Sequence, residues 1–152
     1  KLQAGRAWAV NKSDNTDIPN IGIAGPTGAT TTGSATQLID SSATFLTSGV
    51  KLNMIVVNTT DNTQAVVIGI EDDNTLTVSA NIFAVSGKNY AIYGGDQEGA
   101  VLYIGTAGNL KVTTVAGDDV TFQGVNTGTF FPVNVVKVFA TGTSADNIIA
   151  LW

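Results

Sequence analysis

The sequence predicts an all-β protein, and three observations carry this prediction. Short runs rich in Val, Ile, Thr and aromatic residues alternate with turns rich in Gly, Asp and Asn along most of the chain. Apolar residues do not recur at the three-and-four spacing of an amphipathic helix for more than about one turn. Strong helix formers such as Glu, Gln, Arg and Met are scarce. Strands joined by tight turns are therefore the expected structure.

The N-terminal part of the chain predicts one strand followed by irregular connections. An apolar run at residues 7–10 reads as a short strand, and the polar residues 11–17 follow it as a turn. Pro19 disfavours a helical conformation for the residue before it, so an extended connection is expected there. Residues 23–35 are low in complexity and rich in Gly and Thr, which indicates a linker or an exposed loop.

The middle of the chain predicts a compact group of five short strands. A single helical turn is expected within residues 41–49, and Asp72-Asp73-Asn74 indicates a hairpin between the third and fourth strands. Five short strands suit a small barrel, which closes a sheet and removes its edges. The five strands are expected at residues 37–40, 54–58, 64–71, 75–79 and 89–93.

The C-terminal part predicts a second Gly-rich linker at residues 94–99 and then five more strands. A hairpin turn is expected at residues 116–119, and Pro132 is expected at the start of a strand, where its missing N–H costs little. The last apolar run, residues 148–152, must be paired in a sheet or buried against a neighbouring subunit. The five strands are expected at residues 101–104, 109–115, 120–122, 133–139 and 148–152.

Composition and charge exclude several classes of function. The net charge is −5, and the seven basic residues are scattered, which argues against a nucleic-acid surface and a polybasic membrane anchor. No run of about 20 apolar residues suggests a membrane-spanning helix. The sequence contains no His and no Cys, so Ser-His-Asp, Cys-His and His-ligated zinc chemistries are absent. We therefore expect a protein that is not an enzyme, uses no cofactor and binds neither nucleic acid nor membrane.

A resemblance to a known family rests on three C-terminal segments. Residues 102–114, which begin with Leu102-Tyr103-Ile104-Gly105, resemble the head spike-base and capsid decoration (cement) proteins of tailed phages and gene transfer agents, as do residues 119–133 and 140–152. In that family a stretch like residues 10–17 lies shortly before the first of these segments, whereas here the two are far apart.

This departure from the family pattern predicts a split domain. Residues 1–22 plus 96–152 are expected to form an oligomeric base domain, a jelly-roll-like β-sandwich. Residues 23–95 are expected to be an inserted small β-barrel module, which is similar to small β modules of phage structural proteins. Both borders of the insert are Gly-rich, as expected where a domain is inserted into an exposed loop.

The resemblance implies a structural role on the virion, at the capsid surface, with no catalytic residues. It implies a homo-oligomer, a trimer before a pentamer, that binds the major capsid protein. The low content of charged residues, 12% against about 25% in an average domain, would leave exposed sheet edges unprotected. The alternative is a host-adsorption or carbohydrate-binding module of a phage fibre or spike, with the insert contacting glycans. Six large apolar residues are the candidates for the core or for the oligomer and capsid interface: Trp8, Phe130, Phe131, Phe139, Leu151 and Trp152.

Other candidate sites favour structural interpretations. Glu71-Asp72-Asp73 and Asp118-Asp119 lack the spacing of a calcium loop and are expected to be hairpin turns. Asp14 and Asp17 are expected to cap the local backbone in turns, and an ion site is the less favoured alternative. A glycosidase needs paired acids beside aromatic platforms, and this chain has two glutamates and 7% aromatic residues. The Gly-rich residues 22–28 lack the Gly-Lys-Ser/Thr ending of a phosphate-binding loop.

Overall fold

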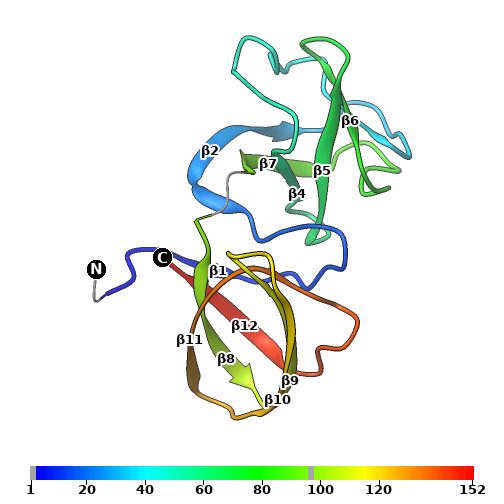
Figure 1. Cartoon of the computed structure of the whole chain (residues 1–152). Helices are drawn as coiled ribbons and strands as arrows, with labels where there is room; N and C mark the ends of the chain where they lie inside the picture. The colour runs from blue at the N-terminus through cyan, green and yellow to red at the C-terminus, as the bar shows by residue number, and fades with distance from the viewer. Residues whose placement is uncertain (1–2, 96–97) are drawn as a thin grey trace. The chain divides into compact units, whose positions relative to one another are not determined.

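The computed structural model describes residues 3–95 and 98–152. Twelve strands and no helix occur in these residues, arranged as two antiparallel six-stranded sheets (Figure 1). The predicted all-β fold class is confirmed. The eleven predicted strands all occur, with ends shifted by no more than four residues, and a twelfth strand was not predicted. No helix in the described residues is long and apolar enough to cross a membrane.

The chain divides into two compact units. The base unit combines Lys1–Ile18 with Gln97–Trp152, and the insert unit is Pro19–Asp96. The sequence placed these borders after residue 22 and before residue 96. The expected second linker, residues 94–99, includes Asp96 and Gln97, which lie outside the described residues.

The base unit contains one antiparallel sheet in the order β1-β12-β8-β11-β9-β10. The first and last strands of the chain are neighbours in this sheet. The strands are β1 (Ala7–Ala9), β8 (Ala100–Thr106), β9 (Gly108–Thr114), β10 (Asp119–Val125), β11 (Thr129–Val138) and β12 (Asp146–Leu151).

The apolar end of the chain is paired within its own base unit. Trp8 of β1 lies opposite Ala150 of β12. Beyond the strands, the backbone N–H of Trp152 donates to the carbonyl of Arg6 at 3.1 Å, and the N–H of Gly5 donates to the carbonyl of Trp152 at 2.6 Å. The other edge of β12 pairs with β8. Both edges of this apolar strand are thus satisfied without a neighbouring subunit.

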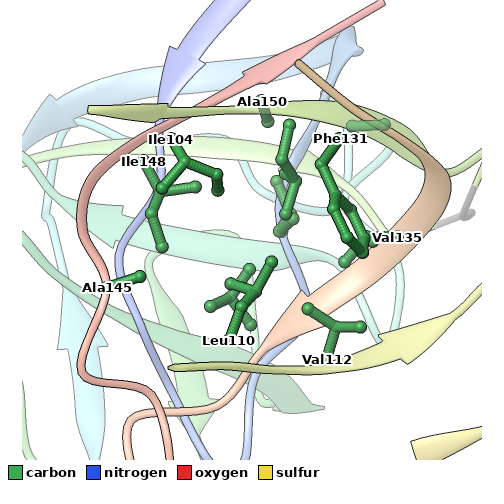
Figure 2. Packing of buried hydrophobic residues seen from close by; sticks show 12 residues of the cluster. Ile104, Leu110, Val112, Phe131, Val135, Ala145, Ile148 and Ala150 are labelled. Carbon is green, nitrogen blue, oxygen red and sulfur yellow. The ribbon is translucent and has the colours of Figure 1, made fainter. Parts of the chain in front are cut away.

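Strand β11 lets the base sheet enclose a core. Its first part, Thr129–Phe131, pairs with β8, whereas Lys137 and Val138 pair with β9. Figure 2 shows Leu110 and Val112 of β9 pointing into the same interior as side chains from β8, β11 and β12. The expectation that Pro132 starts a strand is wrong, because Pro132 lies inside β11. It falls where the pairing register with β8 shifts, a position at which a missing N–H is tolerated.

The insert unit contains the second antiparallel sheet, in the order β2-β7-β4-β5-β6-β3. The hairpin expected at residues 72–74 joins β5 and β6. The single turn expected within residues 41–49 is present, with the N–H of Ser48 donating to the carbonyl of Thr44 at 2.7 Å. The strands are β2 (Asn20–Ala29), β3 (Gln37–Ile39), β4 (Ile55–Asn58), β5 (Thr63–Ile70), β6 (Thr75–Val78) and β7 (Asn89–Gly94).

The linker expected at residues 23–35 is wrong for its first half, which belongs to the ten-residue strand β2. This strand lies at the edge of the sheet and pairs only with β7 among the named strands. Pro26 is tolerated because one side of an edge strand needs no N–H donors, and two register shifts interrupt the pairing nearby. These irregularities hide the alternating pattern that identifies a strand in a sequence.

The barrel expected for the insert is also wrong, because its sheet is not closed. Closure would need a continuous ladder between β2 and β3. Instead, β3 has only three residues, and its free side meets the chain after β2 through one isolated bridge, between Thr32 and Ile39. The core of the insert lies against one face of this open sheet, with Phe45, Phe83 and Tyr90 among its buried aromatic side chains.

Candidate functional site

The outer face of the base sheet carries a row of apolar side chains. Leu102 of β8 is fully buried, whereas its neighbours Val101 and Tyr103 point to the opposite face and are half-buried. Strand β12 repeats this alternation and places Ile149 opposite Tyr103 and Leu151 opposite Val101. Four apolar side chains of two adjacent strands therefore share the outer face.

Phe130 of β11 extends this row. It lies opposite Tyr103 in the sheet, and the two ring centroids are 5.3 Å apart. Phe130 is 66% exposed, although it is one of the largest apolar side chains in the protein. We call Val101, Tyr103, Phe130, Ile149 and Leu151 the outer apolar patch.

A pocket of about 500 Å³ opens in the outer apolar patch. None of the described side chains that line it is charged. This described lining suits the insertion of an apolar side chain better than the binding of an ion. Its lining includes Gln3, Val101, Phe130, Asn134, Leu151 and Trp152.

The structure separates the six predicted interface residues into two groups. Phe130, Leu151 and Trp152 line the pocket, and Trp152 also packs against the base core. Trp8 packs against the same core. Phe131 and Phe139 are only 7% and 9% exposed, so they are core residues rather than surface residues.

The two buried aromatic residues, Phe131 and Phe139, have clear structural partners. The ring of Phe131 meets that of Phe122 edge to face, with centroids 4.6 Å apart. The ammonium groups of Lys111 and Lys137 lie 4.4 and 4.6 Å from the ring centroid of Phe139. Sequence reasoning missed Val101, Tyr103 and Ile149 as patch residues. The signal that could have found them is the strict alternation of their strands, in which residues between buried positions must face outwards.

The carboxylates of the acidic turns accept hydrogen bonds from nearby residues of the protein. Asp72 accepts a hydrogen bond from the N–H of Asn74 at 2.8 Å, the turn expected from the sequence. Glu71 accepts one from the hydroxyl of Thr77 at 2.8 Å. The carboxylate of Asp119 is similarly bonded to a threonine hydroxyl of the facing strand. No group of three or more His, Cys, Asp or Glu that could hold a metal ion occurs in residues 3–95 and 98–152.

Asp14 and Asp17 differ from each other and from the expected local turns. Asp14 accepts bonds from the N–H and the hydroxyl of Thr141, at 2.9 and 2.7 Å, and these bonds lower its pKa. The local turn is capped instead by the hydroxyl of Ser13. Burial raises the pKa of Asp17, and attraction to Lys137 opposes this shift. Asp14 therefore joins two distant turns, which residue spacing alone does not reveal.

The fold and this surface define an all-β protein of two units with an uncharged apolar patch on the base unit. Comparisons with protein-family models, with curated proteins and with solved structures found no match to this chain. The resemblance to phage decoration and spike-base proteins therefore stays a prediction.

Proposed function

We propose that this chain is a non-enzymatic structural subunit of a phage-like virion, a capsid decoration (cement) or head spike-base protein. In this proposal it forms a homo-oligomer, a trimer before a pentamer, and binds the major capsid protein at the capsid surface. The resemblance of the C-terminal segments supports the virion role, and the outer apolar patch supports assembly.

The observation that carries the assembly proposal is the exposure of Phe130. A large aromatic ring that is 66% exposed, beside a pocket whose described lining side chains are uncharged, is costly to leave in water. Aromatic residues that enter pockets of a partner provide much of the binding energy at protein interfaces. A neighbouring subunit that covered this ring and filled the pocket would bury apolar area on both partners.

We propose that the outer apolar patches of three subunits meet around a three-fold axis, so that each patch contacts its two neighbours through different sides. Phe130 of one subunit enters the pocket of the next, lined by Val101 and Leu151. Contacts of this head-to-tail kind generate rings when the rotation between subunits closes, and a trimer is the smallest such ring. The chain end contributes through Trp152, which lines the pocket while its backbone stays paired with Arg6.

Light scattering after size-exclusion chromatography tests this proposal with the Phe130→Ser variant. The wild-type protein is expected to elute as an oligomer and the variant as a monomer, because the substitution removes the anchor without emptying the core. Val115→Ser is the matched control, since Val115 is 50% exposed and lies outside the pocket lining. Phe130→Ser is a cleaner test than removal of Leu151 and Trp152, which would also break the pairing with β1.

Two outcomes would count against the proposal. A wild-type protein that stays monomeric at every concentration would remove self-assembly through this patch. An oligomer that persists in Phe130→Ser would show that another surface makes the contact. A loss of assembly in both variants would point to general destabilisation instead, and circular dichroism of each variant reveals that case.

The second candidate function is a host-adsorption or carbohydrate-binding module. One observation favours it, a polar pocket in the insert unit that contains a buried carboxylate.

A further inference from the structure

The insert unit contains a pocket of about 450 Å³ between β2 and the turn that follows β3. This volume is within the range of small-molecule sites in proteins, about 300–1,000 Å³. Its described lining is rich in hydroxyl groups and includes the carboxylate of Asp40, whereas the described lining of the base pocket includes no acidic side chain. Its lining includes Thr27, Gly28, Thr31, Asp40, Ser42 and Tyr90.

A rigid polar pair lies in the wall of this pocket. The hydroxyl of Tyr90 donates to Oδ2 of Asp40 at 2.8 Å, and the two residues are only 2% and 5% exposed. The ring of Tyr90 is held from the core side by Phe45 and Phe83, with centroids 6.0 and 6.5 Å away. The carboxylate is thus presented at a fixed position.

The backbone of β2 approaches this pair closely because residue 28 is glycine. A Cβ atom at Gly28 would lie 2.6 Å from both Oδ2 of Asp40 and the hydroxyl oxygen of Tyr90. Any other residue at this position would collide with the polar pair. The sequence therefore has the one residue that lets β2 pass over the carboxylate and still leaves a pocket there.

The hydrogen-bonding capacity of the pocket is only partly used. The Asp40 carboxylate accepts from Tyr90 and from the N–H of Ser42, whereas a carboxylate can accept about four bonds. The hydroxyl of Thr31 is bonded within the protein. The hydroxyls of Thr27 and Ser42 are exposed at the rim and have no hydrogen bond with the described residues.

These groups select the chemistry of a ligand. The carboxylate requires a donor and repels an anion. Protein sites for divalent cations commonly combine more than one carboxylate, and no second acidic residue is among the described residues that line the pocket. A neutral hydroxyl group suits this pocket, because it can donate to the carboxylate and can both donate to and accept from the hydroxyls of the lining.

We propose that this pocket binds a neutral sugar ring, with Asp40 accepting bonds from adjacent ring hydroxyls and with Thr27 and Ser42 bonding to others. The site belongs to the insert unit and does not rest on the assembly proposed for the base unit. Tyr90 and Gly28 have positioning roles, since one orients the carboxylate and the other admits the backbone beside it.

Nuclear magnetic resonance of the ¹⁵N-labelled full chain tests this proposal. The probes are the methyl glycosides of glucose, galactose, mannose and N-acetylglucosamine, with methylammonium chloride and maltoheptaose as separate arms. At least one glycoside is expected to shift amide signals of residues 27–29 and 40–44 in a saturable way. A stronger response to maltoheptaose than to methyl glucoside would identify a glycan chain, rather than a single ring, as the ligand source.

The double variant Thr27→Val with Ser42→Ala identifies the site. Both residues are exposed, so the fold is expected to persist, while the affinity falls about tenfold through the loss of two hydrogen bonds. Thr63→Val with Ser86→Ala is the matched control, because both residues are exposed and lie outside the pocket lining, and it should bind as wild type does.

Three results would overturn the proposal. The first is that no glycoside shifts these signals at any concentration up to its solubility. The second is that methylammonium alone does so, which would make the pocket a cation site. The third is equal affinity of the double variant and the wild type, which would place the sugar elsewhere.

Discussion

The base and insert units each contain a six-stranded antiparallel sheet, yet different interactions stabilise the inside of each unit. The base core is mostly aliphatic, and its sheet joins the two ends of the chain, because β1 pairs with β12. The insert instead buries polar side chains among its apolar ones, notably Asp40 and Asn58. Its strands are also joined by longer irregular segments, such as residues 40–54 and 79–88.

Asn58 shows what the buried polar residues of the insert do. Its side chain is fully buried and makes four hydrogen bonds. It accepts from the N–H groups of Thr60 and Asp61 and donates to the carboxylate of Asp61 and the carbonyl of Ile82. Asn58 thus joins the turn after β4 to the long connection before β7. Apolar burial stabilises the base, whereas a few polar side chains hold the connections of the insert in place.

The largest test of this comparison removes one unit. Asn20 and Gly94 are paired partners where the chain enters and leaves the insert, so a short Gly linker can replace residues 20–95. The base is expected to stay folded, and the unfolding transition of the insert should disappear. Hydrogen exchange of the β8 and β12 amides measures this outcome. Loss of their protection would show that the base core depends on the insert.

A smaller effect is expected from Leu102→Ala in the base. Leu102 is fully buried in the aliphatic core, and its truncation should lower the free energy of unfolding of the base by about 4 kcal/mol. Hydrogen exchange should show this loss in β8, β9 and β12 while the insert strands keep their protection. Val115→Ala is the control, since Val115 is half exposed. An equal loss in both units would mean that they unfold together.

Asn58→Ala is the reciprocal experiment in the insert. It removes four hydrogen bonds and leaves buried backbone groups without partners, which should cost about 3 kcal/mol in the insert alone. Hydrogen exchange of the β4 and β7 amides would report this loss, while the base strands should keep their protection. The exposed Asn81→Ala is the control. A loss below about 1 kcal/mol would contradict the structural role given to buried polar residues.

The smallest effect concerns a charge in the base. Burial raises the pKa of Asp17, so the folded base binds this proton more tightly than the unfolded chain. The resulting stabilisation is complete below the ordinary aspartate pKa and is lost as pH rises through the raised pKa. Asp17→Asn should therefore stabilise the base slightly at neutral pH and not at low pH. Urea midpoints from pH 3 to 7 measure the difference, and a variant that is less stable at neutral pH would contradict this sign.

The errors of sequence reasoning have a common physical cause. Strand β2 was missed because Gly and Pro interrupt its pattern, and an edge strand with register shifts tolerates both. Pro132 was misplaced because a register shift accommodates it inside β11. The predicted barrel is wrong because closure of the sheet depends on how far β3 pairs on its second side. Each of these features depends on pairing with a distant segment.

The candidate sites show the same division. An interface role for Phe130 and Leu151 was predicted, and both line the base pocket, but Phe131 and Phe139 are buried. Phe130 and Phe131 are neighbours of the same residue type, and only the register of β11 decides which one faces water. The insert pocket was not predicted at all. Its Asp40 lies 50 residues from Tyr90 in the sequence.

The sequence by itself determined the all-β class, the position of eleven strands and the hairpin turns. These features follow from alternation, β-branched composition and the local hydrogen bonds of Asp and Asn, all of which act over a few residues. Only the tertiary structure decided that β1 closes against β12, that the outer apolar patch forms across three strands, and that Gly28 passes over the Asp40–Tyr90 pair. Those arrangements arise from contacts between distant segments, whose register and spacing are set by packing of the whole unit.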